Sequence, residues 1–254
     1  MVDGSAGDAN YAEIGVSYSR YRRPDPRIGA AISTALRDAR TVLNVGAGAG
    51  SYEPLDREVT AVEPSASMRA QRPSTLSAAV DAVAEDLPFA DDSFDATMST
   101  FSVHQWSDLN AGLREVRRIT RGPVVVLTCD PDLLRQFWLV DYAPEVIETE
   151  ARRYPSRTAL AEGLGGHTHS SPVPVPLDCT DGFNEAYYGR PEGLLDSHAR
   201  LSCSAWSFLD PSVQDRVTKH LRRDLDNGTW DRRYGSLRTQ PTFNGALVLV
   251  VSDR

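Results

Sequence analysis

The feature that most constrains the fold is an apolar run that ends in closely spaced glycines. The run covers Val42 to Val45, and glycine follows at positions 46, 48 and 50. A short apolar run bounded by glycine is typical of a buried strand. A buried parallel strand that ends in glycines, with a helix to follow, presents a nucleotide-like ligand at the carboxyl edge of an open α/β sheet. A plain turn needs one glycine, so three at alternate positions favour a ligand-binding loop.

The position of the next acidic residue narrows the class of ligand. Glu63 ends a second apolar run and comes seventeen residues after Gly46. Dinucleotide-binding folds use the spacing G-x-G-x-x-G with an acid about 20 residues further on. Here the spacing is G-x-G-x-G and the acid arrives early. Because one carboxylate can accept from both ribose hydroxyls, the loop and this acid fit a nucleoside ligand without a pyrophosphate.

The same stretch resembles the cofactor loop of the class I S-adenosylmethionine-dependent methyltransferases. The resemblance is to the small-molecule branch, which includes the ubiquinone-type and trans-aconitate-type enzymes. The family pattern is acid-x-Gly-x-Gly-x-Gly, and residues 44–50 match it except at Asn44, which carries no charge. Residues 87–95, from Leu87 to Asp95, match a second family segment, LPF-x-D-x-SFD. The resemblance extends from Tyr11 to Asp130, about half of the chain.

The resemblance implies an α/β fold with a doubly wound, mostly parallel, seven-stranded sheet. It implies S-adenosyl-L-methionine as the cofactor and a transferase that methylates O, N or C of a small organic molecule. By resemblance Glu63 holds the ribose and Arg22 the cofactor carboxylate, while Ala84 and Glu85 flank the adenine because the usual aspartate position is Val83. The residues expected to bind the cofactor are Tyr18, Arg22, Asn44, Gly46, Ala47, Gly48, Gly50, Glu63, Pro64, Ala84, Glu85 and Phe101.

His104 is the candidate catalytic residue, and two interpretations of it stay open. It lies in the segment from Phe101 to Trp106, which follows an expected strand at residues 94–100. An imidazole there could take a proton from the methyl acceptor. Alternatively, His104 and Trp106 only wall the pocket, because a sulfonium is already an activated leaving group and positioning supplies much of the acceleration. No metal is expected.

Strands that alternate with helices up to residue 128 predict a parallel sheet, and the rest of the chain divides less clearly. We expect a cofactor domain of residues 1–183 plus 244–254. Residues 184–243, which carry five tyrosines and tryptophans, are expected as a helical insertion that forms a substrate lid. Residues 165–176 are rich in Pro, His and Ser and predict a loop, with a strand at 173–177.

The composition excludes several classes of partner. A net charge of −8 argues against nucleic acid, because neutralising phosphates requires a basic surface. No apolar run of about 18 residues predicts a membrane span. Three scattered cysteines indicate free thiols and a cytoplasmic location rather than a disulfide framework.

Two alternative functions remain at the level of sequence. One is an NAD-type oxidoreductase, which the glycine spacing and the early acid disfavour. The other is a catalytically silent module that binds S-adenosylmethionine as a sensor.

Overall fold

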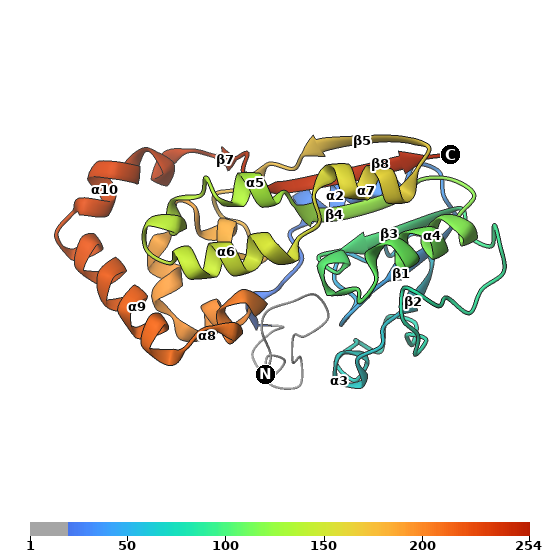
Figure 1. Ribbon diagram of the computed structural model, residues 1–254, viewed down its shortest axis with the longest axis horizontal. Helices are drawn as coiled ribbons and strands as arrows, with labels where there is room; N and C mark the ends of the chain where they lie inside the picture. The colour runs from blue at the N-terminus through green and yellow to red at the C-terminus, as the bar shows by residue number, and fades with distance from the viewer. Residues whose placement is uncertain (1–19) are drawn as a thin grey trace. The chain divides into compact units, whose positions relative to one another are not determined.

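The computed structural model describes residues 20–254, and Figure 1 labels its helices and strands. These residues form two compact units, each built from several segments of the chain. The sheet unit comprises residues 26–130, 154–173 and 247–254. The helical unit comprises residues 20–25 together with 131–153 and 174–246. Tyr18, which is expected at the cofactor, lies outside the described residues.

The sheet unit alternates strands and helices over most of its length. Its strands are β1 (Thr41–Val45), β2 (Glu58–Val62), β3 (Ala96–Thr100), β4 (Val124–Cys129), β5 (His167–Pro172) and β8 (Leu247–Asp253). Its helices are α2 (Pro26–Ala35), α3 (Ala66–Arg69), η1 (Val103–Gln105), α4 (Leu109–Ile119) and α7 (Arg157–Leu164).

The strand order of the sheet is β2-β1-β3-β4-β8-β5, and its first four strands run parallel. The two remaining strands are antiparallel to their neighbours. The chain passes from β1 to β2 on one side and later returns to β3 on the other, so the strand order reverses at β1. In open α/β sheets ligands bind beyond the carboxyl ends of the strands at such a reversal. The expected doubly wound, mostly parallel α/β fold is confirmed.

The expectation of seven strands is wrong for the described residues, whose main sheet has six. The place beside β2 is taken by Val80 alone, which forms a single parallel bridge with Val62. The residues that flank Val80 are alanine, serine and aspartate. These residue types pack poorly on a pleated surface, so the pairing does not extend into a strand.

The loop expected at residues 165–176 is also wrong, because half of it is strand β5. This strand pairs with β8 along its whole length and forms an edge of the sheet. Its side chains are largely exposed, so no apolar alternation marks it in the sequence. The strand expected at 173–177 is reduced to β6 (Val175–Pro176), which pairs with β7 (Thr242–Phe243) in the helical unit.

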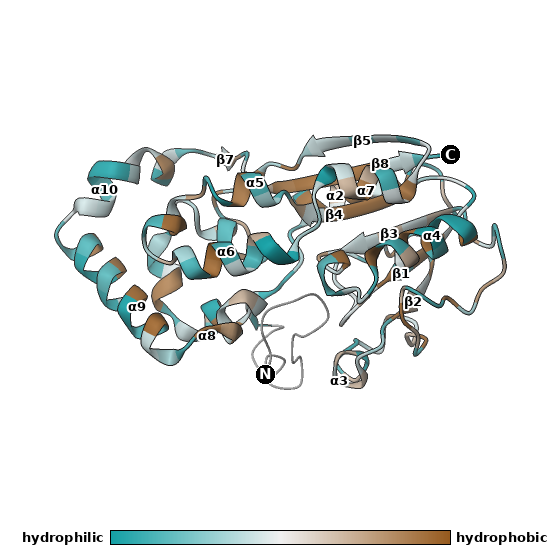
Figure 2. Cartoon of the chain, viewed as in Figure 1, coloured by the Kyte–Doolittle hydropathy of each residue, from teal (hydrophilic) through white to brown (hydrophobic). Residues whose placement is uncertain are grey.

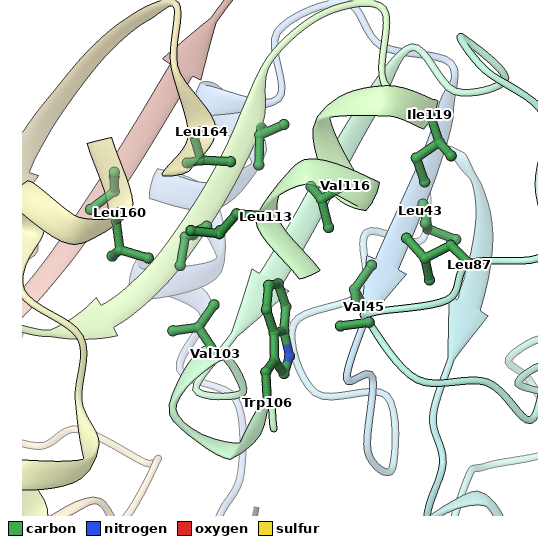
Figure 3. Close-up of a cluster of buried hydrophobic side chains, with 14 of the residues drawn as sticks. Leu43, Val45, Leu87, Val103, Trp106, Leu113, Val116, Ile119, Leu160 and Leu164 are labelled. Atoms are coloured by element: carbon green, nitrogen blue, oxygen red, sulfur yellow. The ribbon is translucent and has the colours of Figure 1, made fainter. Parts of the chain in front are cut away.

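The core of the sheet unit lies between the sheet and the helices α4 and α7 (Figure 3). The strands β4 and β8 are apolar along nearly their whole length (Figure 2), as strands covered on both faces require. The helices contribute side chains at helical spacing, as the periodicity predicts. These side chains are Leu113, Val116 and Ile119 of α4 and Leu160 and Leu164 of α7.

The helical unit consists of short helices and one two-stranded ladder. Its longer helices are α6 (Pro144–Arg153), α9 (Pro211–Asp226) and α10 (Thr229–Tyr234). The shorter ones are α5 (Pro131–Leu134), η2 (Trp138–Asp141), η3 (Asn184–Tyr187), η4 (Pro191–Leu195), α8 (Ser197–Leu201), η5 (Ser204–Phe208) and η6 (Gly235–Thr239).

The aromatic residues of segment 184–243 build a core inside the helical unit. Trp206 and Trp230 are fully buried, and the ring of Trp230 meets that of Trp138 edge-on with centroids 5.5 Å apart. Residues 131–153 therefore pack with segment 184–243 in one unit. Whether that segment acts as a lid stays a prediction. Within residues 20–254, no helix combines the length and apolar character needed to cross a bilayer.

Asp95, the last residue of the matched segment 87–95, fixes the start of β1. Its Oδ2 accepts from the backbone N–H groups of Arg40 and Thr41, both at 3.0 Å. Its Oδ1 accepts from the guanidinium of Arg121 at 2.6 Å. The hydrogen bonds from Thr41 and Arg121 hold the pKa of Asp95 well below its usual range.

We expect Asp95→Asn to lower the free energy of unfolding by about 1–2 kcal/mol at neutral pH. Because the folded-state pKa is lowered, the carboxylate stabilises the fold above the unfolded pKa, and this contribution is lost as the pH falls. The variant should therefore lose less stability than the wild type between about pH 5 and pH 2. Urea unfolding at several pH values measures both effects. Asp56→Asn, at an exposed residue, is the control, and equal pH slopes in all three proteins would contradict the role of Asp95.

Candidate cofactor site

The predicted cofactor residues of the sheet unit meet at the carboxyl ends of β1, β2 and β3. Val45 and Val62 pair at the last position of the β1–β2 ladder, so Gly46 and Glu63 follow side by side. Phe101 follows the last residue of β3, on the other side of β1. Three segments distant in sequence thus share one edge, as the parallel arrangement requires.

The glycine loop requires glycine for its backbone and for its space. Gly46, Gly48 and Gly50 have φ angles of 69°, 53° and 94°, in the left-handed region that side chains disfavour. A Cβ at Gly46 would lie 2.2 Å from Oγ of Ser102, and one at Gly48 would lie 3.3 Å from Cε of Met68. A plain turn does not impose these conditions at three alternate positions, so the geometry fits a loop that lets a ligand approach the backbone.

Ser102 ties the turn after β3 to the end of β1, and sequence reasoning missed it. Its hydroxyl donates to the carbonyl of Val45 at 2.9 Å and lies 2.8 Å from the hydroxyl of Ser99. The indole N–H of Trp106 donates to the hydroxyl oxygen of Ser102 at 3.3 Å. The available signal is its position inside the segment 101–106, directly after the expected strand.

Glu63 is hydrogen-bonded to the glycine loop, beside which it is expected to bind the ribose. Its Oε2 accepts from the N–H of Gly48 and its Oε1 from the N–H of Ser65, both at 2.8 Å. The residue is only 7% exposed. A carboxylate has about four lone-pair sites, so these two bonds leave capacity for two hydroxyl donors. The arrangement is compatible with a ribose grip, which stays a prediction.

Phe101 and His104 follow β3 and belong to the turn at its carboxyl end. Phe101 has a φ of 51°, an uncommon conformation for a residue with a side chain and one that clusters at functional sites. His104 is buried in η1, and its ring lies 4.4 Å from that of Tyr154, centroid to centroid. A buried, ring-packed imidazole fits a pocket wall, and it also fits a base held in one orientation.

The two residues expected at the adenine lie beside the start of α4. Ala84 is buried in the same apolar cluster as Trp106. Oε1 of Glu85 accepts from the N–H of Asp108 at 2.9 Å, and Asp108 is the residue that caps α4. This bond fixes the turn at 84–85 relative to α4. Pro64, which follows Glu63, is exposed. The contacts of these residues with a cofactor remain predictions.

Arg22 lies in the helical unit and is paired there. Its Nε donates to Oδ1 of Asp181 at 2.5 Å, and both side chains are largely buried. Its expected contact with the cofactor carboxylate stays a prediction.

Comparison with known proteins places this site in a family. The methyltransferase domain family matches residues 43–128. A crystal structure of an Anabaena variabilis protein, named as a methyltransferase from an antibiotic biosynthesis pathway, is 30% identical with a TM-score of 0.84. That match covers 92% of this chain and 99% of the Anabaena chain. The geranyl diphosphate C-methyltransferase of Streptomyces coelicolor, 15% identical with a TM-score of 0.51 over 90% of this chain and 79% of its own, shares the fold.

Curated relatives match over shorter stretches. The uncharacterised methyltransferase YcgJ of Bacillus subtilis is 34% identical over 131 residues, which cover 46% of this chain and 47% of YcgJ. The uncharacterised protein YafE of Escherichia coli is 50% identical over 46 residues, 17% of this chain and 22% of its own. The chain thus spans less than half of the length of these curated relatives.

The chain belongs to the class I S-adenosylmethionine-dependent methyltransferases, because a 30% identical methyltransferase matches it over nearly the whole of both chains. S-adenosyl-L-methionine is its methyl donor. The glycine loop and Glu63 fit that cofactor, since the loop leaves room for close approach and the carboxylate retains lone pairs. This membership decides against an NAD-type oxidoreductase.

We expect Glu63→Ala to weaken the binding of S-adenosylhomocysteine at least about tenfold, because it removes an acceptor for two hydroxyls and releases the N–H of Gly48. Isothermal titration calorimetry measures the affinity. Glu58→Ala, at the exposed start of the same strand, is the matched control and should bind as the wild type does. Unchanged affinity in a folded Glu63→Ala protein would rule out the ribose assignment.

Proposed function

We propose that this methyltransferase acts on a small organic molecule, at an O, N or C atom. The observation that carries the proposal is the match to the Anabaena protein over almost its full length, since that protein is named for antibiotic biosynthesis. The net charge of −8 also disfavours a nucleic acid as the acceptor. We further propose a cytoplasmic location without membrane attachment, which is consistent with three buried cysteines at scattered positions.

In this proposal the sheet unit holds the cofactor. Gly46, Ala47, Gly48 and Gly50 receive it along their backbone, and Glu63 accepts from the ribose. The bound cofactor supplies an electrophilic methyl group on a sulfonium. Every other task falls to the chain: it must place the acceptor in line with that methyl and keep water out. The remaining expected contacts are Tyr18, Arg22, Pro64, Ala84, Glu85 and Phe101, whereas Asn44 is fully buried and would act on the loop rather than on the cofactor.

In this proposal the helical unit supplies the wall for the acceptor, with segment 184–243 as the lid.

A chain of hydrogen-bonded polar groups runs through the aromatic interior of the helical unit. The indole N–H of Trp206 donates to Oδ1 of Asn184 at 2.9 Å, and Nδ2 of Asn184 donates to Oε2 of Glu150 at 2.8 Å. Burial raises the pKa of Glu150. A carboxyl group that is oriented in this way can select a polar substituent on an otherwise apolar acceptor.

Production of S-adenosylhomocysteine in the presence of a library of small phenols, amines, carboxylic acids and activated carbon acids tests this function. We expect turnover with members of that library and none with transfer RNA or unfolded protein. A protein that binds the cofactor yet turns over none of the compounds would support the silent module instead. Turnover with the macromolecules would overturn the proposal of a small acceptor.

His104→Asn distinguishes a proton acceptor from a wall once a substrate is known. A base predicts a loss of kcat of about 10²-fold or more and the disappearance of the acid limb of the pH–rate profile. A wall predicts that KM rises while the shape of the pH profile is retained. Tyr154→Leu, which removes the ring packed against His104, is the control for a change of packing alone.

A further inference from the structure

A buried ion pair lies against the glycine loop and is not used by the proposed cofactor contacts. The guanidinium of Arg72 donates to both carboxylate oxygens of Glu53, each at 2.9 Å. The side chains are only 4% and 2% exposed. A bidentate pair of this kind fixes both partners in direction as well as in distance.

Arg72 joins the loop to the segment beyond α3. Its Nε and Nη2 donate to the carbonyl of Ser77 at 3.1 and 2.9 Å, and Nη1 lies 3.5 Å from the carbonyl oxygen of Gly48. A Cβ at Gly50 would lie 3.2 Å from the same Nη1. The guanidinium therefore rests directly on the loop. Gly48 is held on both sides, its N–H by Glu63 and its carbonyl by Arg72.

Asn44 completes the arrangement from β1. The residue is fully buried, and its Nδ2 donates to Oε1 of Glu53 at 3.0 Å. That oxygen also accepts from Arg72. The family pattern has an acid at position 44, and a carboxylate there would face Glu53 at hydrogen-bond distance, where like charges repel. The neutral amide of Asn44 is therefore compatible with the buried carboxylate of Glu53, nine residues later in the chain, whereas an acid would not be.

The loop needs such a support because the residue that ends it, Tyr52, has a backbone conformation that side chains disfavour. Tyr52, beside Glu53, has a φ of 65°, which adds a left-handed residue with a side chain to the three glycines. Conformations of this kind persist only where the surroundings over-determine them. A guanidinium next to the loop has a cost, however, since the cofactor itself is cationic at its sulfonium. Glu53 cancels that charge.

We propose that Asn44, Glu53 and Arg72 form a charge-balanced clamp that holds the glycine loop in its cofactor-binding conformation. The three are positioning residues, and the inference rests on the cofactor function given above. The clamp makes two separate contributions. The fork of Arg72 fixes the loop for any adenosyl ligand, and the carboxylate of Glu53 removes the repulsion of the sulfonium.

The test compares the dissociation constants of S-adenosylmethionine and S-adenosylhomocysteine, which differ in the positive charge on sulfur. Glu53→Gln leaves Arg72 uncompensated and should weaken S-adenosylmethionine at least about threefold more than S-adenosylhomocysteine. Arg72→Lys keeps the charge but loses the fork, and should weaken both ligands about tenfold with their ratio unchanged. An ion pair that only stabilises the fold would shift both ligands alike in both variants.

A charge exchange provides a second, independent measurement. Asn44→Asp places a second carboxylate against Glu53 and should weaken S-adenosylhomocysteine about tenfold. The double variant Asn44→Asp/Glu53→Gln again has one carboxylate in the cluster with Arg72 and should recover most of that loss. If Glu53→Gln alone does not fold, this recovery carries the test, and failure of the double variant to bind better than Asn44→Asp would overturn the clamp.

The matched control is the bidentate pair of Arg37 with Asp253, whose two N–O distances are 2.8 Å. This pair lies at the amino-terminal ends of the parallel strands, away from the glycine loop, because Ser252 pairs with the first residue of β4. Asp253→Asn makes the same change of charge as Glu53→Gln and should leave the ratio of the two affinities unchanged. An equal shift of the ratio in both variants would overturn the clamp. A wild-type protein that binds neither ligand would instead contradict the cofactor function.

Discussion

The left-handed backbone of the loop after β1 is the constraint on which the site depends. Its glycines have positive φ angles at alternate positions, and no side chain fits at Gly46 because Ser102 occupies that space. Glu63, Ser102 and Arg72 come from three other segments, and each contacts this loop or the end of β1. The loop is therefore a point of convergence, and its shape is set by groups that the local sequence does not contain.

In the proposed function the two units divide the tasks of a methyl transfer. The sheet unit carries the residues that fit the cofactor, on strands whose order is fixed by parallel pairing. The helical unit is built from short helices around an aromatic core, with a polar chain from Trp206 to Glu150. Because a methyl group on sulfonium is already activated, positioning supplies much of the acceleration, and positioning the acceptor is the role that we propose for the helical unit.

Much of the sheet unit was predictable because its signals are local in sequence. The apolar runs of β1, β2 and β4, the periodicity of α4 and the glycine spacing are each visible within a dozen residues. The edge strand β5 was not predictable, because its exposed side chains leave no apolar alternation. The seventh strand was expected by resemblance and is replaced by the bridge of Val80, since the residues around it do not favour pairing.

The sequence by itself determined the class of fold, the glycine loop and the position of Glu63 at the end of β2, because glycine spacing and strand ends have direct conformational meaning. It could not reveal that Arg72 and Glu53 meet against that loop, or that Asn44 belongs with them. Neither an arginine nor a glutamate carries a local signal for burial, and both are usually exposed. Only the tertiary structure brought the two charges together, because a buried charge becomes tolerable when its partner arrives from elsewhere in the chain.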